Sequence, residues 1–262
     1  MEYRIEKDSL GELKIPKDAL YGVQVARAQE NFQISGEPLL TEMIQAYAEL
    51  KKACAQANQE LGLLSNELAK PIVKAADEVI DGKHDKHFVV DVFQAGAGTS
   101  TNMNLNEVIA NRALEIMGKE RGDYHSLSPN DHVNMAQSTN DTYPTAMRMA
   151  VAMQCKKFDQ ALAILEHCFH KKAQQFKKVI KSARTHLQDA VPITLGQEFN
   201  AHCNTIKGLR KDLADSQAQV MELGIGGSAA GTGLNVHAVC TKSNKAVESE
   251  YRAKIQRGIR SD

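Results

Sequence analysis

Three polar stretches carry most of the side chains that could bind a small anion. They run from Gly96 to Asn106, from Gln137 to Thr142 and from Ser182 to Ala190. They offer mainly neutral hydroxyls and amides, which can stabilise negative charge as it develops during a reaction. His186 is the one histidine among them, a residue type that commonly serves as an acid or a base. Together they favour a small anionic substrate, although each stretch alone is also typical of a helix cap or a polar turn.

The second stretch lies just before a long segment of periodic apolar residues, which begins after Pro144. Proline fits the first turn of a helix, because its missing N–H has no partner there in any case. Ser138, Thr139 and Asn140 are residues that cap such a turn. The sequence therefore predicts a loop that delivers hydroxyls and an amide to a helix N-terminus, where unpaired N–H groups favour an anion.

Two further motifs do not predict a cofactor or metal site. Residues 224–229 match G-x-G-x-x-A, but they follow a helix pattern rather than a strand, so dinucleotide binding is not expected. Residues 84–87, His-Asp-Lys-His, lack an obvious third and fourth ligand nearby. We interpret them as a solvated turn and expect no cofactor.

The segments that must position these stretches are mostly helical. Apolar residues recur in steps of three and four over 39–61, 68–79 and 158–180, and a further helix follows the glycine-rich turn at 96–101. A short hairpin is expected from residues 3–5 and 13–15, a strand or buried loop at 88–93, a loop at 119–133 and an interruption at 182–192. The fold class is therefore all-α.

The clearest helix runs from 195 to 223, with Thr194 and Gln197 predicted to form its capping box. Its apolar residues form two seven-residue registers, which indicates packing against other long helices. His202 and Ser216 lie on this seam and are expected to be satisfied polar core groups. We predict an N-terminal helical domain over 1–139, a partial helical bundle over 140–237 and a divergent tail over 238–262.

Composition argues against several classes of partner. Lys+Arg and Asp+Glu are each 32, so the formal net charge is zero, which disfavours general binding to nucleic acid or to membrane surfaces. The five cysteines include no C-x-x-C pair, which favours a reducing, cytoplasmic setting. The charged N-terminus shows no secretory signal, and no apolar run is long enough to span a bilayer.

Several motifs together resemble the fumarase/aspartase superfamily. They occur in order from about Arg4 to His237, nearly without gaps, at 96–107 (GAGTSTNMNLNE), 137–141 (QSTND), 185–190 (THLQDA), 195–199 (LGQEF) and 231–235 (GTGLN). Gln137-Ser-Thr-Asn-Asp stands where fumarases tend to have Ser-Ser-Asn-Asp, so the sequence is most similar to the aspartase branch.

The resemblance implies an anti-elimination without metal or cofactor, in which L-aspartate gives fumarate and ammonia. A base removes a proton from Cβ, and an aci-carboxylate dianion forms before ammonia leaves. By motif position, His186 is the catalytic candidate that stabilises a substrate carboxylate. The implied ligands of the carboxylates and the amino group are Thr99, Ser138, Thr139, Asn140, Thr185 and His186. The resemblance also implies a homotetramer whose subunits jointly form each site around this small dicarboxylate.

The sequence departs from the superfamily pattern in one respect. The base of the family is a serine on a loop of the type Gly-Ser-Ser-x-Met-Pro-x-Lys-x-Asn, and these 262 residues do not contain that loop. We therefore expect a truncated lyase. Whether this chain turns over substrate by itself is left open. Two alternatives remain: a fumarate hydratase that interconverts malate and fumarate, and a non-catalytic fragment that acts as an assembly module.

Overall fold

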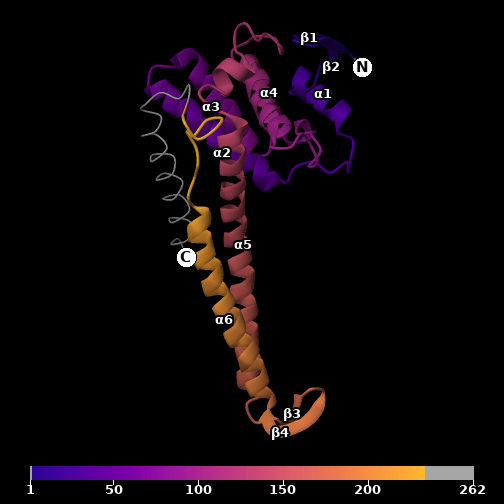
Figure 1. The fold of residues 1–262 in the computed structure, drawn as a ribbon, viewed down its shortest axis with the longest axis vertical. Coiled ribbons are helices and arrows are strands. Elements are labelled where there is room, and N and C mark those ends of the chain that lie inside the picture. The colour runs from indigo at the N-terminus through magenta and orange to yellow at the C-terminus, as the bar shows by residue number, and fades with distance from the viewer. Residues whose placement is uncertain (1, 234–262) are drawn as a thin grey trace. The chain divides into compact units, whose positions relative to one another are not determined.

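A computed structural model describes residues 2–233, and the predicted tail at 238–262 lies outside this range (Figure 1). The described residues are predominantly helical, with two short antiparallel hairpins, which confirms the all-α prediction. In chain order the elements are β1 (Tyr3–Asp8), β2 (Gly11–Pro16), α1 (Val23–Asn31), α2 (Thr41–Glu60), α3 (Asn66–Ile80), η1 (Asp85–His87), α4 (Thr99–Ile116), η2 (Pro129–Val133), α5 (Thr139–Gln175), β3 (Ile180–Thr185), β4 (Gln188–Thr194) and α6 (Leu195–Val220).

The described chain forms two compact units. The first contains residues 2–150 and 223–233, and the second contains 151–222, so α5 contributes residues to both. The division at 139/140 that we expect from the motifs stays a prediction.

The first unit is built around α4, which is buried on nearly every side. Its apolar residues pack against α2 and α3, and its polar residues bind the backbone of other segments. Asn104 donates to the His87 carbonyl at 2.9 Å, and Asn111 donates to the Leu20 carbonyl at 2.8 Å. Buried amides of this kind need partners, since an unpaired one costs desolvation energy.

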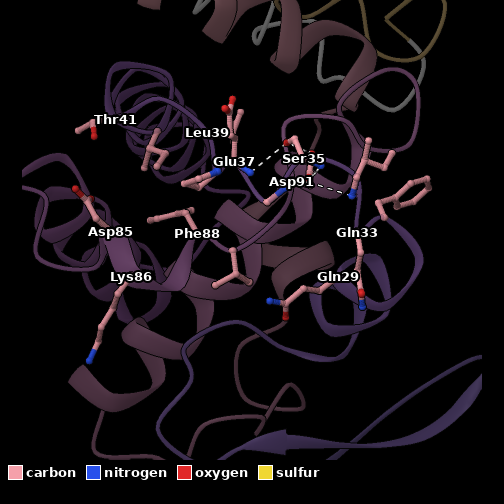
Figure 2. Close-up of a pocket in the computed structure, with 16 residues that line it drawn as sticks. Gln29, Gln33, Ser35, Glu37, Leu39, Thr41, Asp85, Lys86, Phe88 and Asp91 are labelled. Atoms are coloured by element: carbon pink, nitrogen blue, oxygen red, sulfur yellow. Dashed lines mark hydrogen bonds between the residues drawn. The ribbon is translucent and has the colours of Figure 1, made fainter.

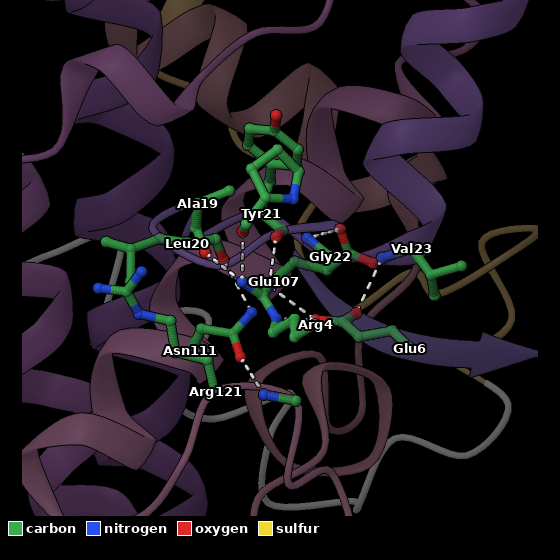
Figure 3. Close-up of polar contacts among 12 residues, drawn as sticks. Arg4, Glu6, Ala19, Leu20, Tyr21, Gly22, Val23, Glu107, Asn111 and Arg121 are labelled. Carbon is green, nitrogen blue, oxygen red and sulfur yellow. Dashed lines mark hydrogen bonds and ion pairs between the residues drawn. The ribbon is translucent and has the colours of Figure 1, made fainter. Parts of the chain in front are cut away.

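The predicted N-terminal hairpin is confirmed as β1–β2, and buried charges attach it to the core (Figure 3). Arg4 donates to the carbonyls of Ala19 and Tyr21 at 2.7 and 2.8 Å. Glu107 on α4 accepts hydrogen bonds from the backbone N–H groups of Gly22, Gln24 and Val25 at 2.7, 3.0 and 3.2 Å. A carboxylate at these otherwise unpaired N–H groups stabilises the start of α1.

In the second unit, α5 and α6 are joined by the β3–β4 hairpin. The predicted capping box is confirmed, because Gln197 N donates to Thr194 Oγ1 at 3.1 Å and Thr194 N donates to Gln197 Oε1 at 2.8 Å. Gly196 allows the close approach of α6 to the end of α5, since a Cβ there would overlap the Ala173 carbonyl. Arg210 of α6 bridges Asp159 and Glu166 of α5, both at 2.8 Å.

The structure specifies some local expectations and corrects others. Residues 182–192 belong to a hairpin with a bulge between Ser182 and Arg184, and the predicted loop at 119–133 includes the π-helical turn η2. Of the two alternatives for 88–93, the buried loop is confirmed. Phe88, Val90 and Asp91 are buried, and the run forms no strand, only an isolated bridge from Asp91 to Pro38. The prediction of a solvated turn at 84–87 is wrong for His87, because this side chain is buried and accepts a hydrogen bond from Leu20 N.

The seam of α6 also differs from the expectation. His202 and Ser216 are exposed in this chain, so they are not core groups here. Leu209, on the same register, is 50% exposed, and Phe158 on α5 is 56% exposed. The second unit by itself therefore leaves part of its apolar surface in solvent.

Candidate functional site

The second polar stretch forms the N-terminus of α5, which begins at Thr139 and so includes Pro144 within its early turns. Thr139 and Asn140 therefore lie in the helix itself rather than in a preceding loop. Asn140 N donates to Ser138 Oγ at 3.2 Å, and Ser138 N donates to Asp141 Oδ1 at 3.0 Å. This capping fixes the segment that carries the three candidate side chains.

The N-terminus of α4 lies beside the N-terminus of α5. Gly98 precedes Thr99 with a φ of 81°, and a Cβ at Gly98 would overlap the Tyr143 ring. Asn102, one turn into α4, donates from Nδ2 to Thr139 Oγ1 at 3.0 Å. The first and second polar stretches thus meet, and Thr99 remains exposed at this junction. A helix N-terminus favours an anion, and two of them lie in one place here.

A buried polar network lies behind this junction. Tyr47 of α2 donates to Asn102 Oδ1 at 2.8 Å, and its hydroxyl is 2.7 Å from Thr142 Oγ1. Lys51, one turn further along α2, donates from Nζ to Asn134 Oδ1 at 2.9 Å and to Gln137 Oε1 at 2.8 Å. The network therefore connects α2, α4 and the segment that leads into α5.

Lys51 is fully buried, and its ammonium donates to neutral amide oxygens. Burial lowers the pKa of Lys51 to about 7, because removing the ammonium from water disfavours its charged form. A cation here would add positive potential behind the α5 N-terminus, which complements an anionic ligand.

Thr185 and His186 belong to the second unit, at the turn between β3 and β4. Both side chains are exposed. His186 and Leu187 form the two-residue turn with φ values of 47° and 62°, a left-handed conformation that non-glycine residues rarely adopt. The structure therefore brings Thr99, Ser138, Thr139 and Asn140 together in the first unit and places Thr185 and His186 on a separate hairpin.

A cavity of about 740 Å³ lies elsewhere in the first unit, lined mainly by residues 29–44 and 85–91 (Figure 2). Asp91 beside it accepts from the backbone N–H groups of Ser35, Gly36 and Phe93 at 2.7–2.8 Å. Burial raises the pKa of Asp91, but these donors lower it by more, so it lies well below its ordinary value. The carboxylate is thus already occupied in holding the 34–36 turn.

Among residues 2–233, neither a metal-binding cluster nor a membrane-spanning helix is found. No group of three or more His, Cys, Asp or Glu side chains within residues 2–233 is arranged to hold a metal ion. None of the described helices is both long and apolar enough to cross a bilayer.

Sequence reasoning missed the network behind the site. Lys51 lies on the apolar face of α2, four residues after Tyr47, and a lysine at a core position of a helix pattern is a usable signal. Asn102 was visible as part of the first polar stretch, but its role as a link to Thr139 needs the fold.

Comparisons with known proteins show which family has this helical scaffold and these two polar helix N-termini. A family model described as a lyase matches residues 11–248. An aspartate ammonia-lyase from Bacillus sp. is 53% identical over 234 residues, covering 89% of this chain and 50% of the relative. A class II fumarate hydratase from Thermus thermophilus is 51% identical, covering 90% and 51%.

Solved structures agree with these matches. A cobalt-bound crystal structure of a fumarate lyase:delta crystallin protein from Brucella melitensis superposes with a TM-score of 0.93 at 48% identity, covering 95% of this chain and 55% of that one. The chain belongs to the lyase family of the fumarase/aspartase superfamily. It spans about half the length of the curated relatives that it matches.

Proposed function

We propose that this chain supplies substrate-binding residues of a lyase that converts L-aspartate to fumarate and ammonia. The observation that carries the proposal is the meeting of two helix N-termini at Asn102 and Thr139, with Thr99, Ser138 and Asn140 beside them. Neutral hydroxyls, amides and backbone N–H groups suit a dicarboxylate whose charge increases in the transition state.

The elimination balances without an external reactant. A base takes a proton from Cβ, the electron pair moves to give an aci-carboxylate dianion, and the C–N bond then breaks to release ammonia and leave fumarate. Ser138 and Thr139 would bind the carboxylate that becomes the dianion. Thr185 and His186 are further proposed ligands, in a site that several subunits form jointly. The proton acceptor is not assigned to a residue of this chain.

The geometry of Asn140 supports an amino substrate. Its Nδ2 donates to the Ala229 carbonyl at 2.8 Å, and within residues 2–233 its Oδ1 accepts no hydrogen bond. A carbonyl only accepts, so this contact fixes the amide orientation and leaves Oδ1 as an acceptor. An acceptor suits an ammonium group, which has donors only.

A fumarate hydratase is the second candidate, since hydratases match at nearly the same identity as aspartate ammonia-lyases. The third is an assembly module, favoured by the exposed apolar residues of α5 and α6, including Ile164 at 67%. The same residues support a homo-oligomer, which we propose to be a cytoplasmic tetramer.

The test measures fumarate by ultraviolet absorbance after the purified chain is mixed with L-aspartate or with L-malate. Fumarate formed from L-aspartate would support the assignment and would show that a base outside the family loop acts. Its rate should fall by about 10²–10³ in Ser138→Ala and in His186→Ala, the size typical of a lost transition-state donor. Ser65→Ala and His125→Ala, both exposed, are the matched controls and should keep the rate.

The other outcomes separate the candidates. Fumarate from L-malate alone would identify a hydratase. No fumarate from either substrate, in a folded sample that associates through its helices, would favour the assembly module.

A further inference from the structure

The glycine-rich segment at 224–233 folds around the side chain of Asp141. Asp141 is buried, and its Oδ2 accepts hydrogen bonds from Gly226 N at 3.1 Å and from Ser228 N at 2.8 Å. Its Oδ1 accepts from Ser138 N at 3.0 Å. One carboxylate therefore joins the glycine-rich segment to the N-terminus of α5.

The backbone of this segment is shaped to bind an anion. Gly226 and Ser228 have φ values of 91° and 57°, both in the left-handed region. The segment is closed on itself by hydrogen bonds from Gly227 N to the Gly224 carbonyl and from Gly233 N to the Gly227 carbonyl, at 3.2 and 3.1 Å. Backbone N–H groups that converge in such a turn form an anion-binding concavity. The G-x-G-x-x-A motif thus does bind an anion, and the anion is the protein's own Asp141.

The same segment also contacts the neighbouring candidate ligand. The Ala229 carbonyl accepts from Asn140 Nδ2 at 2.8 Å, as described above. Asn140 and Asp141 are adjacent, so the glycine-rich segment holds the first turn of α5 at two consecutive side chains.

We propose that Asp141 is a positioning residue and that residues 224–233, which we name the glycine clasp, hold Ser138 and Asn140 in their substrate-binding geometry. Asp141 acts through these neighbours and not on the reacting atoms. The functional part of this inference rests on the proposed function, in which Ser138 and Asn140 bind the substrate.

The first test is amide hydrogen exchange of the full chain, followed by mass spectrometry, for wild type and Asp141→Asn. The variant keeps the side-chain shape but replaces one accepting oxygen by an amide nitrogen that cannot accept. A hydrogen bond to a charged group protects the donating backbone amide from hydrogen exchange. Losing that bond should speed the exchange of this amide roughly tenfold to hundredfold. We expect this at both 226–228 and 138–140. Asp131→Asn, an exposed aspartate of the same unit, is the matched control and should change neither.

The second test perturbs the clasp without touching α5. A Cβ at Gly227 would lie 3.2 Å from the Gly224 carbonyl oxygen and 3.3 Å from Gly231 Cα, tighter than ordinary contacts. Gly227→Ala should therefore also speed exchange at 138–140. Gly224→Ala meets nothing within 4 Å and is the matched control. Unchanged exchange at 138–140 in both Asp141→Asn and Gly227→Ala would overturn the proposal.

Turnover gives the readout that a purely structural role would not move. With L-aspartate as substrate, Asp141→Asn should raise KM about tenfold and change kcat less, because a misplaced ligand weakens binding in the ground state and the transition state alike. Faster exchange with an unchanged KM would overturn the positioning role. A wild-type chain that produces no fumarate would count against the proposed function, and the exchange experiment would still decide whether the clasp holds 138–140.

Discussion

Asn102 on α4 and Thr139 on α5 are joined by a hydrogen bond of 3.0 Å, so the two helix N-termini that carry the candidate ligands are fixed to one another. The Asn102 amide is buried and uses both ends, since its Oδ1 accepts from Tyr47 while its Nδ2 donates. The geometry of the site therefore depends on a residue that need not touch a ligand.

Replacing Asn102 by alanine should destabilise the first unit. The change leaves Thr139 without this donor and leaves the buried Tyr47 hydroxyl with one neighbour fewer, and an unsatisfied buried group costs about 1–3 kcal/mol. The measurement is the free energy of unfolding from denaturant titration. Asn130→Ala, at an exposed position, should change it by less than about 0.5 kcal/mol. Equal stability of the two variants would show that the network does not contribute.

The buried Lys51 predicts a specific pH dependence of stability. Its pKa is lowered by burial from 10.5 to about 7 in the folded chain. Between these two values the unfolded chain binds more protons than the folded chain, so the free energy of unfolding rises with pH. The contribution is at most about 1.4 kcal/mol per pH unit.

Denaturant titrations from pH 7 to pH 9 test this effect. Lys51→Met should remove the rise, while Lys70→Met, on the exposed face of α3, should retain it. A rise of the same slope in Lys51→Met would show that another group is responsible.

Glu78 predicts a dependence of the same sign in acid, where the free energy of unfolding also rises with pH. Hydrogen bonds from Arg112 and His84 hold the pKa of Glu78 at about 2, against an ordinary value of 4.5. The resulting stabilisation is fully present above pH 4.5 and is lost as the pH falls toward 2. Glu78→Gln should flatten this part of the stability curve, and Glu60→Gln, at an exposed position, should not. Circular dichroism during acid titration provides the measurement.

The helices and the chemistry of their ends could be predicted from the sequence, because both are local. Apolar spacing locates α2, α3 and α6, and the Thr194–Gln197 capping box is a contact between residues three apart. The hairpin at 3–16 was predicted from its apolar runs and its turn. The polar stretches were identified by composition alone.

The contacts between segments distant in sequence could not be predicted in this way. The Asn102–Thr139 bond joins residues 37 apart, and the clasp binds Asp141 from 85 and 87 positions away. The apolar run at 88–93 was ambiguous because its length suits either a strand or a buried loop. We expect His202 in a core because most residues of its seven-residue register are apolar. The described chain does not contain the surface that would cover this register.

The turn at His186 and Leu187 offers a test of backbone strain next to a candidate ligand. Leu187 has a φ of 62° and is 92% exposed, so its side chain has little packing to offset the conformation. A left-handed residue costs roughly 1–2 kcal/mol, whereas glycine adopts this region freely but loses more entropy on folding, about 0.5–1 kcal/mol. Leu187→Gly should therefore stabilise the hairpin by up to about 1 kcal/mol. Slower amide exchange in β3 and β4 would report this gain. Val191→Gly, at an exposed position of β4, should speed exchange instead, since glycine weakens a strand. Faster exchange in Leu187→Gly would mean that Leu187 itself stabilises the turn.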